Sequence, residues 1–228
     1  MSLEARRVIS ESDVIVGYNT YIELINEFIS SDQRTYSTGM RGEVKRAKRA
    51  IELVLDGKQV AVVSSGDSGI YGMAGLLLEM IHKKDIDLDL EVVAGITSAS
   101  EAASSLGAPL MNDFAAISLS NLMTPWGNIK NRLVAAAKAN FVVLLYNPRS
   151  SSRTEQIKEA RKIMLEYRDE LTPVGIVWNA GREGEKVVLT NLRNMLDHKI
   201  DMVTTVIIGN SDTFISEGYM VTPRGYEL

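Results

Sequence analysis

The chain has 228 residues, of which 45% are hydrophobic and 24% are charged, a composition typical of folded proteins and not of disordered ones. Its 25 lysines and arginines against 29 aspartates and glutamates give a net charge of −4, which argues against general binding of nucleic acids or membrane surfaces. The chain has no cysteine, which excludes disulfides, thiolate metal ligands and a cysteine nucleophile.

Two further features narrow the class of protein. No apolar run approaches the roughly 18 to 20 residues that a membrane span needs, and the start MSLEARRV lacks the apolar region of a signal peptide. We therefore expect a cytoplasmic protein. His82 and His198 are the only histidines, so we expect no metal site.

Short apolar runs alternate with amphipathic stretches along the chain, a pattern that predicts an α/β fold. In the first half, helices are expected over residues 3–12, 43–55 and 97–105, and another is expected to carry Leu76, Leu77, Met80 and Ile81. Apolar residues also recur at helical spacing over 21–29. Strands are expected over residues 13–17, 59–63 and 90–93.

Residues 106–113, which contain Gly107, Pro109 and Asn112, are expected to form a connector, after which the alternation starts again. Strands are expected over residues 115–119, 141–146, 174–178, 187–189 and 204–208, and helices over 129–139 and 154–167. The pattern therefore predicts two α/β domains, residues 1–112 and 113–228.

Three loops follow apolar strands, at the place where ligands collect in open α/β sheets. They are SSGDSGIYG (64–72), VAGITSASE (93–101) and LYNPRSSSR (145–153). Each also has a purely structural interpretation. Asp67 or Ser68 can cap a helix, Thr97 or Ser98 can do the same with Glu101 as a capping-box partner, and exposed arginines often have no specific role.

The sequence contains no GxSxG elbow, Walker motif or HExxH motif, so no catalytic residue can be named from it. The turn NAGREG (179–184) is as compatible with a hairpin as with a ligand loop.

In their order and spacing, these loops resemble those of the tetrapyrrole (corrin and porphyrin) methylases. Residues 65–71 are similar to the GDP-type loop of that family, with Ser68 in the usual proline position, and residues 93–100 to its PGIT/S-type loop, with Ala94 in the proline position. Further stretches of likeness are residues 16–21, 113–122 with 124–126, and 146–153. The likeness covers nearly the whole chain.

One part of the family pattern has no counterpart. Members of the family begin with a strand and a GxGPG-type loop before the helix that here starts at Leu3. The resemblance implies that this strand would be an inner element of the first sheet and that the loop would face the substrate.

The resemblance implies S-adenosylmethionine as cofactor, bound in a cleft between the two α/β domains of a homodimer, and a tetrapyrrole as substrate. It implies methylation of a corrin precursor at C17, with ring contraction, in cobalamin synthesis. By position, the implied cofactor contacts are Ser65, Gly66, Asp67, Ile70, Thr97, Ser98, Asn147 and Ala180. Because the substrate carries several carboxylates, Arg41, Arg149 and Arg153 are the expected substrate contacts.

Three alternatives stay open. The chain could methylate another tetrapyrrole carbon, or it could bind tetrapyrrole or S-adenosylmethionine without catalysis. An NAD-dependent oxidoreductase is a weaker alternative, because no GxGxxG with a following acidic residue is present.

Overall fold

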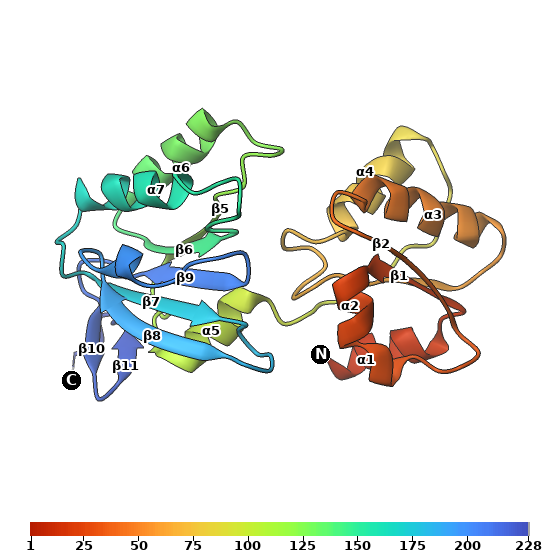
Figure 1. Cartoon of the computed structure of the whole chain (residues 1–228), viewed down its shortest axis with the longest axis horizontal. Coiled ribbons are helices and arrows are strands. Elements are labelled where there is room, and N and C mark those ends of the chain that lie inside the picture. The colour runs from red at the N-terminus through yellow and green to blue at the C-terminus, as the bar shows by residue number, and fades with distance from the viewer. Residues whose placement is uncertain (228) are drawn as a thin grey trace. The chain divides into compact units, whose positions relative to one another are not determined.

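The computed structural model of the chain describes residues 1–227. Its contacts divide it into two compact units, Met1–Thr97 and a second that begins at Ser98. Each unit contains a β-sheet with helices packed on it, which confirms the α/β class expected from the alternating pattern (Figure 1). Within residues 1–227, no helix is long and apolar enough to cross a membrane.

The first unit is built on a parallel three-stranded sheet with the order β2-β1-β3. Its strands are β1 (Val14–Tyr18), β2 (Arg34–Thr38) and β3 (Val60–Val62). Its helices are α1 (Leu3–Glu11), α2 (Asn19–Leu24), the 3₁₀ turn η1 (Asn26–Phe28), α3 (Glu43–Leu55) and α4 (Ala74–Lys83).

The central strand β1 is buried on both faces because its side chains alternate between two layers. Val14 and Val16 join the core cluster that α3 and α4 supply, whereas Ile15 joins the cluster on the α1 side. Figure 1 shows α3 and α4 on one face of this sheet and α1 and α2 on the other. Helices thus cover both faces, and the loops at the strand ends stay accessible.

The expected strand over residues 90–93 is wrong, because these residues pair with no strand. Their apolar side chains have a different role. Leu90 packs with Ile86 and Leu88 against the cluster that contains Leu77 of α4. The carbonyl of Val93 accepts a hydrogen bond from the Ser68 hydroxyl at 3.0 Å, so this part of the segment is held by a loop and not by a neighbouring strand.

The second unit is built on a five-stranded mixed sheet with the order β5-β6-β9-β7-β8. Its strands are β5 (Phe114–Ser118), β6 (Val142–Tyr146), β7 (Pro173–Trp178), β8 (Lys186–Asn191) and β9 (Thr204–Ile208). Its helices are α5 (Ser98–Leu106), α6 (Trp126–Lys138), α7 (Gln156–Leu165) and the 3₁₀ turn η2 (Met195–Asp197). A small sheet of β4 (Gly107–Ala108), β10 (Phe214–Ser216) and β11 (Tyr219–Val221) completes the unit.

Alternating side chains of β6 again supply two cores. Val143 and Leu145 pack in the cluster with α6 and α7, and Val142 and Leu144 pack in the cluster with α5. Figure 1 shows α6 and α7 on one face of the sheet and α5 on the other.

Helix α5 belongs with the second unit because its buried face lies on the second sheet. Leu106 is fully buried, and its side chain lies over Gly175 of β7. The contacts therefore divide the chain at Thr97, earlier than the boundary at residue 112 that the sequence pattern suggests. The boundary at 112 stays a prediction.

The close approach of α5 to the sheet makes Gly175 a testable position. A Cβ added to Gly175 would lie 2.3 and 2.6 Å from the Cδ atoms of Leu106, which has no free space to move into. We expect Gly175→Ala to lower the free energy of unfolding by about 1–3 kcal/mol through overpacking. Gly127→Ala in α6 is the matched control, because nothing lies within 4 Å of its added Cβ. Equal thermal stability of the two variants would contradict this packing.

Candidate functional site

The strand directions bring the predicted loops to one edge of each sheet. In the first unit all three strands are parallel, so the loops that follow β2 and β3 leave from the same edge. In the second unit β5, β6 and β7 share one direction, because β5 is parallel to β6 and both β6 and β7 are antiparallel to β9. The loops after these strands and the segment before β9 therefore share that edge, where α/β folds bind ligands.

In the first unit, the carboxylate of Asp67 ties two loops together. Its Oδ1 accepts a hydrogen bond from the N–H of Gly69 at 2.8 Å within its own loop, and its Oδ2 accepts from the N–H of Gly95 at 2.9 Å in the second loop. The N–H groups of Gly95, Gly69 and Ile70 hold the pKa of the Asp67 carboxyl below its usual value. Both carboxylate oxygens thus already have backbone partners.

The same two loops approach so closely that a side chain between them is excluded. A Cβ on Gly95 would lie 2.0 Å from the carbonyl oxygen of Gly66, and Gly66 itself has φ +70°. The loop also caps α4, since the Ser64 hydroxyl accepts a hydrogen bond from the N–H of Met73 at 3.0 Å. Ser65, Gly66, Asp67 and Ile70 therefore lie on a braced loop whose backbone is partly exposed, with Ile70 43% exposed.

In the second unit, Asn147 begins the loop after β6 in a left-handed conformation, with φ 48°. Its side-chain amide donates a hydrogen bond to the hydroxyl of Ser118, at the end of β5, at 3.1 Å. Its carbonyl oxygen accepts a hydrogen bond from Nη2 of Arg153 at 2.9 Å. Hydrogen bonds therefore fix both the side chain and the main-chain carbonyl of Asn147.

The predicted arginines differ in their surroundings. Arg41 (φ 64°) and Arg149 are exposed on loops, whereas Arg153 is only 7% exposed. Burial lowers the pKa of the Arg153 guanidinium. The sequence predicts the same role, substrate contact, for all three arginines, but their surroundings in the structure differ.

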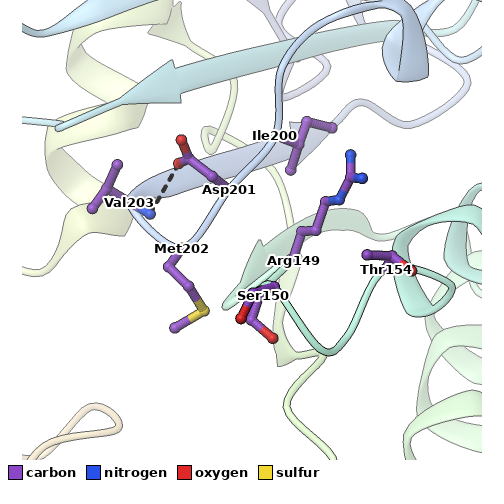
Figure 2. Close-up of a pocket in the computed structure, with 8 residues that line it drawn as sticks. Arg149, Ser150, Thr154, Ile200, Asp201, Met202 and Val203 are labelled. Carbon is purple, nitrogen blue, oxygen red and sulfur yellow. Dashed lines mark hydrogen bonds between the residues drawn. The ribbon is translucent and has the colours of Figure 1, made fainter. Parts of the chain in front are cut away.

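A cavity of about 500 Å³ lies at this edge of the second unit, between the loop after β6 and the segment before β9 (Figure 2). Its lining residues are Arg149, Ser150, Ser151, Thr154, Ile200, Asp201, Met202 and Val203. The carboxylate of Asp201 accepts from the N–H of Val203 at 3.1 Å and from the Thr204 hydroxyl at 2.9 Å, so it braces its own turn. The cavity thus combines one exposed cation, the Asp201 carboxylate, hydroxyl groups and an apolar wall.

The other predicted contacts lie near the same edges. Thr97 and Ser98 precede and begin α5, and Ala180 follows β7 in a turn where Asn179 has φ 50°. Ala180 packs against the core cluster that α5 supplies, and a Cβ on Gly181 would lie 2.9 Å from the Glu101 carboxylate group. Thr97 lies in the first unit, and Ser98, Asn147 and Ala180 lie in the second.

Sequence reasoning missed the segment that forms the apolar wall of the cavity. Ile200, Met202 and Val203 belong to no motif, and their place is set by the antiparallel insertion of β9 between β6 and β7. The only available signal was their position immediately before a buried strand.

Comparison with known proteins identifies the family. The sequence pattern of the tetrapyrrole (corrin/porphyrin) methylases matches residues 1–196. The chain belongs to this family. It is 52% identical over 227 residues to the cobalt-factor III methyltransferase of Priestia megaterium, and the match covers 98% of the chain but only 42% of that longer protein.

A second relative matches this tetrapyrrole methylase over nearly the full length of both proteins. The probable cobalt-factor III C(17)-methyltransferase of Salmonella typhimurium is 45% identical over 228 residues, which cover 100% of the chain and 94% of the relative. Among solved structures, the methyltransferase CobJ superposes with a TM-score of 0.92 at 32% identity, covering 98% and 93% of the two chains. Uroporphyrin-III C-methyltransferase of Thermus thermophilus, complexed with S-adenyl homocysteine, shares the fold with a TM-score of 0.68 at 21% identity over 92% and 90%.

The bridging role of Asp67 leads to a prediction about pH. Its lowered pKa means that the carboxylate contributes stability above the unfolded pKa of about 3.9, and that this contribution is lost as pH falls through the folded pKa. Asp67→Asn keeps one acceptor and loses the charge, so we expect a lower melting temperature at pH 7. The loss corresponds to about 1–2 kcal/mol, and the gap to the wild type should narrow below about pH 4.

The control for this prediction is Asp89→Asn, the same change at an exposed position of the first unit. We expect the melting temperature of this variant to follow that of the wild type across the pH range. A constant gap between Asp67→Asn and the wild type from pH 7 to pH 3 would show that the charge of Asp67 does not stabilise the two loops.

Proposed function

We propose that this tetrapyrrole methylase transfers the methyl group of S-adenosylmethionine to C17 of a cobalt-containing corrin precursor, cobalt-factor III, with contraction of the ring, in cobalamin synthesis. The observation that carries this proposal is the 45% identity to the Salmonella protein named for that reaction, over 100% of the chain and 94% of the relative. The loops at residues 64–72 and 145–153 support it, because they follow β3 and β6 at the edges of their sheets where ligands bind, and the N–H of Gly95 joins the second predicted loop to the first.

The loop after β3 fits an S-adenosyl ligand. Gly66 has no side chain and is exposed, so a ligand can approach the main chain at Ser65 and Gly66. A carboxylate can accept about four hydrogen bonds, and Asp67 uses two of its acceptor sites in the pairs with Gly69 and Gly95. Asp67 can therefore also accept a hydroxyl group of the ligand.

We assign the cofactor to Ser65, Gly66, Asp67, Ile70, Thr97, Ser98, Asn147 and Ala180, the positions that the family likeness gives. When bound, S-adenosylmethionine would supply an electrophilic methyl group on its sulfonium sulfur and would leave as S-adenosylhomocysteine. The residues of the chain bind and orient the two reactants, and such orientation can supply a large part of the rate acceleration. This division of work is consistent with the absence of a recognisable nucleophile motif from the sequence.

We assign the carboxylates of the macrocycle to Arg41 and Arg149, which are exposed. At the 500 Å³ cavity, the guanidinium of Arg149 and the hydroxyl groups of Ser150, Ser151 and Thr154 suit a carboxylate, and Met202 and Val203 suit an apolar ring edge. The cavity is large enough for one edge of a tetrapyrrole and its side chains.

Turnover experiments test this function directly. We expect cobalt-factor III and S-adenosylmethionine to give a product that is heavier by one methyl group and carries it at C17, as measured by mass spectrometry and NMR. The metal-free counterpart of the substrate should react more slowly. Methylation at another carbon would support the first alternative, and binding of S-adenosylhomocysteine without turnover would support a non-catalytic binder.

Arg149 gives a residue-level test. We expect Arg149→Gln to raise the KM for the macrocycle by roughly 10- to 150-fold, corresponding to one lost charge-assisted contact of about 1.5–3 kcal/mol. The dissociation constant for S-adenosylhomocysteine, measured by calorimetry, should stay unchanged. Arg132→Gln on α6 makes the same charge change on an exposed helix and should leave both constants at wild-type values. An unchanged KM in Arg149→Gln would remove this residue from the substrate site.

We also propose a cytoplasmic homodimer. The hairpin β10–β11 leaves Phe214, Ile215 and Tyr219 between 43% and 60% exposed, which supports a protein partner for that face. Sedimentation at micromolar concentration should give about twice the chain mass of 25.1 kDa. A species of the single-chain mass would contradict the dimer.

A further inference from the structure

Arg153 is a buried cation without an acidic partner. Its side chain is 7% exposed, its Nε is buried without a hydrogen bond, and burial is what lowers its pKa. Within residues 1–227 no carboxylate forms an ion pair with it, although an arginine side chain stays protonated in proteins. Removing an ion from water costs several kcal/mol, so the contacts that this guanidinium makes need an explanation.

Those contacts connect two segments at the ligand-binding edge of the second sheet. Nη2 donates to the carbonyl oxygen of Asn147 at 2.9 Å and lies 3.5 Å from Sδ of Met202. The main chain folds back to allow this, because Ser150 and Arg153 form an isolated antiparallel bridge with N–H···O distances of 3.1 and 3.3 Å. The guanidinium thus spans from the start of the loop after β6 to the segment before β9.

The residue held by Arg153 has an unusual backbone. Asn147 has φ 48°, a left-handed backbone conformation. This conformation is unfavourable for most residues, but glycine adopts it readily, and asparagine and aspartate adopt it more often than other residues do. Its amide donates to the hydroxyl of Ser118, and its carbonyl oxygen accepts from Arg153. A hydrogen bond from a charged donor is about twice as strong as a neutral one, so Arg153 can fix the peptide plane that follows Asn147.

We propose that Arg153 is a positioning residue that acts on cofactor binding by orienting the side chain of Asn147, and that it is not a ligand of the macrocycle carboxylates. The inference rests on the proposed function. It separates two arginines of one short loop: Arg149 is exposed at the cavity and binds substrate, whereas Arg153 is buried beneath the loop and sets the geometry of Asn147.

The experiment first measures wild-type binding of S-adenosylhomocysteine and turnover of cobalt-factor III. A wild-type protein that binds no S-adenosylhomocysteine would refute the proposed function itself. With a binding wild type, the variants Arg153→Met and Arg153→Lys test the inference. Arg153→Met keeps an unbranched apolar side chain and removes the charge, and Arg153→Lys keeps the charge and can donate through its ammonium group.

We expect Arg153→Met to raise the dissociation constant for S-adenosylhomocysteine by about tenfold and to leave the KM for the macrocycle within about twofold of the wild type. Arg153→Lys should recover part of the affinity, because an ammonium group can still donate to the Asn147 carbonyl. Arg132→Met on α6 is the matched control and should leave both constants unchanged.

A double-mutant cycle tests the route through Asn147. Asn147→Gly removes the side chain and tolerates the positive φ. If Arg153 acts by orienting that side chain, Arg153→Met should cause no further loss of cofactor affinity in the Asn147→Gly background. Where Arg153→Met does not fold, Arg153→Lys takes its place in the cycle and should show a smaller loss that Asn147→Gly also abolishes.

Three results would overturn the proposal. A raised macrocycle KM with unchanged cofactor affinity would make Arg153 a substrate ligand. Additive losses in the cycle would show that it does not act by orienting the side chain of Asn147. Equal losses for both ligands, with a lower melting temperature and no recovery in Arg153→Lys, would show that it only stabilises the fold.

Discussion

The burial of the strands β1 and β6 on both faces determines where the two larger sheets can bind a ligand. In β1 and β6, neighbouring side chains enter separate core clusters, so helices must cover both sides of each strand. Because both faces of these inner strands are covered, only the ends of the strands are accessible to a ligand. The residues assigned to cofactor and substrate all follow from this constraint, since they lie on loops or at helix starts and not within strands.

Within those loops, single charged side chains hold the backbone in place. Asp67 accepts from the N–H groups of Gly69 and Gly95, and Arg153 donates to the carbonyl of Asn147. Arg46 of α3 is 4% exposed and donates to the Thr38 hydroxyl at 2.7 Å and to the Gly39 carbonyl at 3.2 Å, at the end of β2. Such loops keep a defined shape although they lack regular hydrogen bonding, as orientation of a flat, polar ligand requires.

The spacing of apolar residues predicted those helices and strands in which buried residues recur at regular intervals. Helix α3 was predicted with its observed bounds, because apolar residues recur along one face of Glu43–Leu55. Strand β2 was missed because its sequence, RTYST, is polar and sits at a sheet edge. Residues 90–93 were predicted as a strand because apolar burial against α4 and burial within a sheet leave the same short apolar run.

The site was predictable to the level of loops and not of contacts. Glycine and small residues after apolar strands indicated the three loops, and their spacing indicated the family. Gly95, the partner of Asp67 in the other loop, lies 28 residues away, and Met202, which the guanidinium of Arg153 contacts, lies 49 residues away. Such tertiary pairs leave no periodic signal in a single sequence, so the arginines of residues 145–153 could not be separated by role.

The link between Asp67 and Gly95 has a thermodynamic consequence for recognition. It joins two irregular segments into one body, so much of their conformational entropy is lost when the chain folds and not when a ligand arrives. A small molecule that contacts only the loop of Asp67 therefore binds to a surface that the segment of Gly95 makes more rigid. Less of the interaction energy is therefore lost to ordering these segments when a ligand binds.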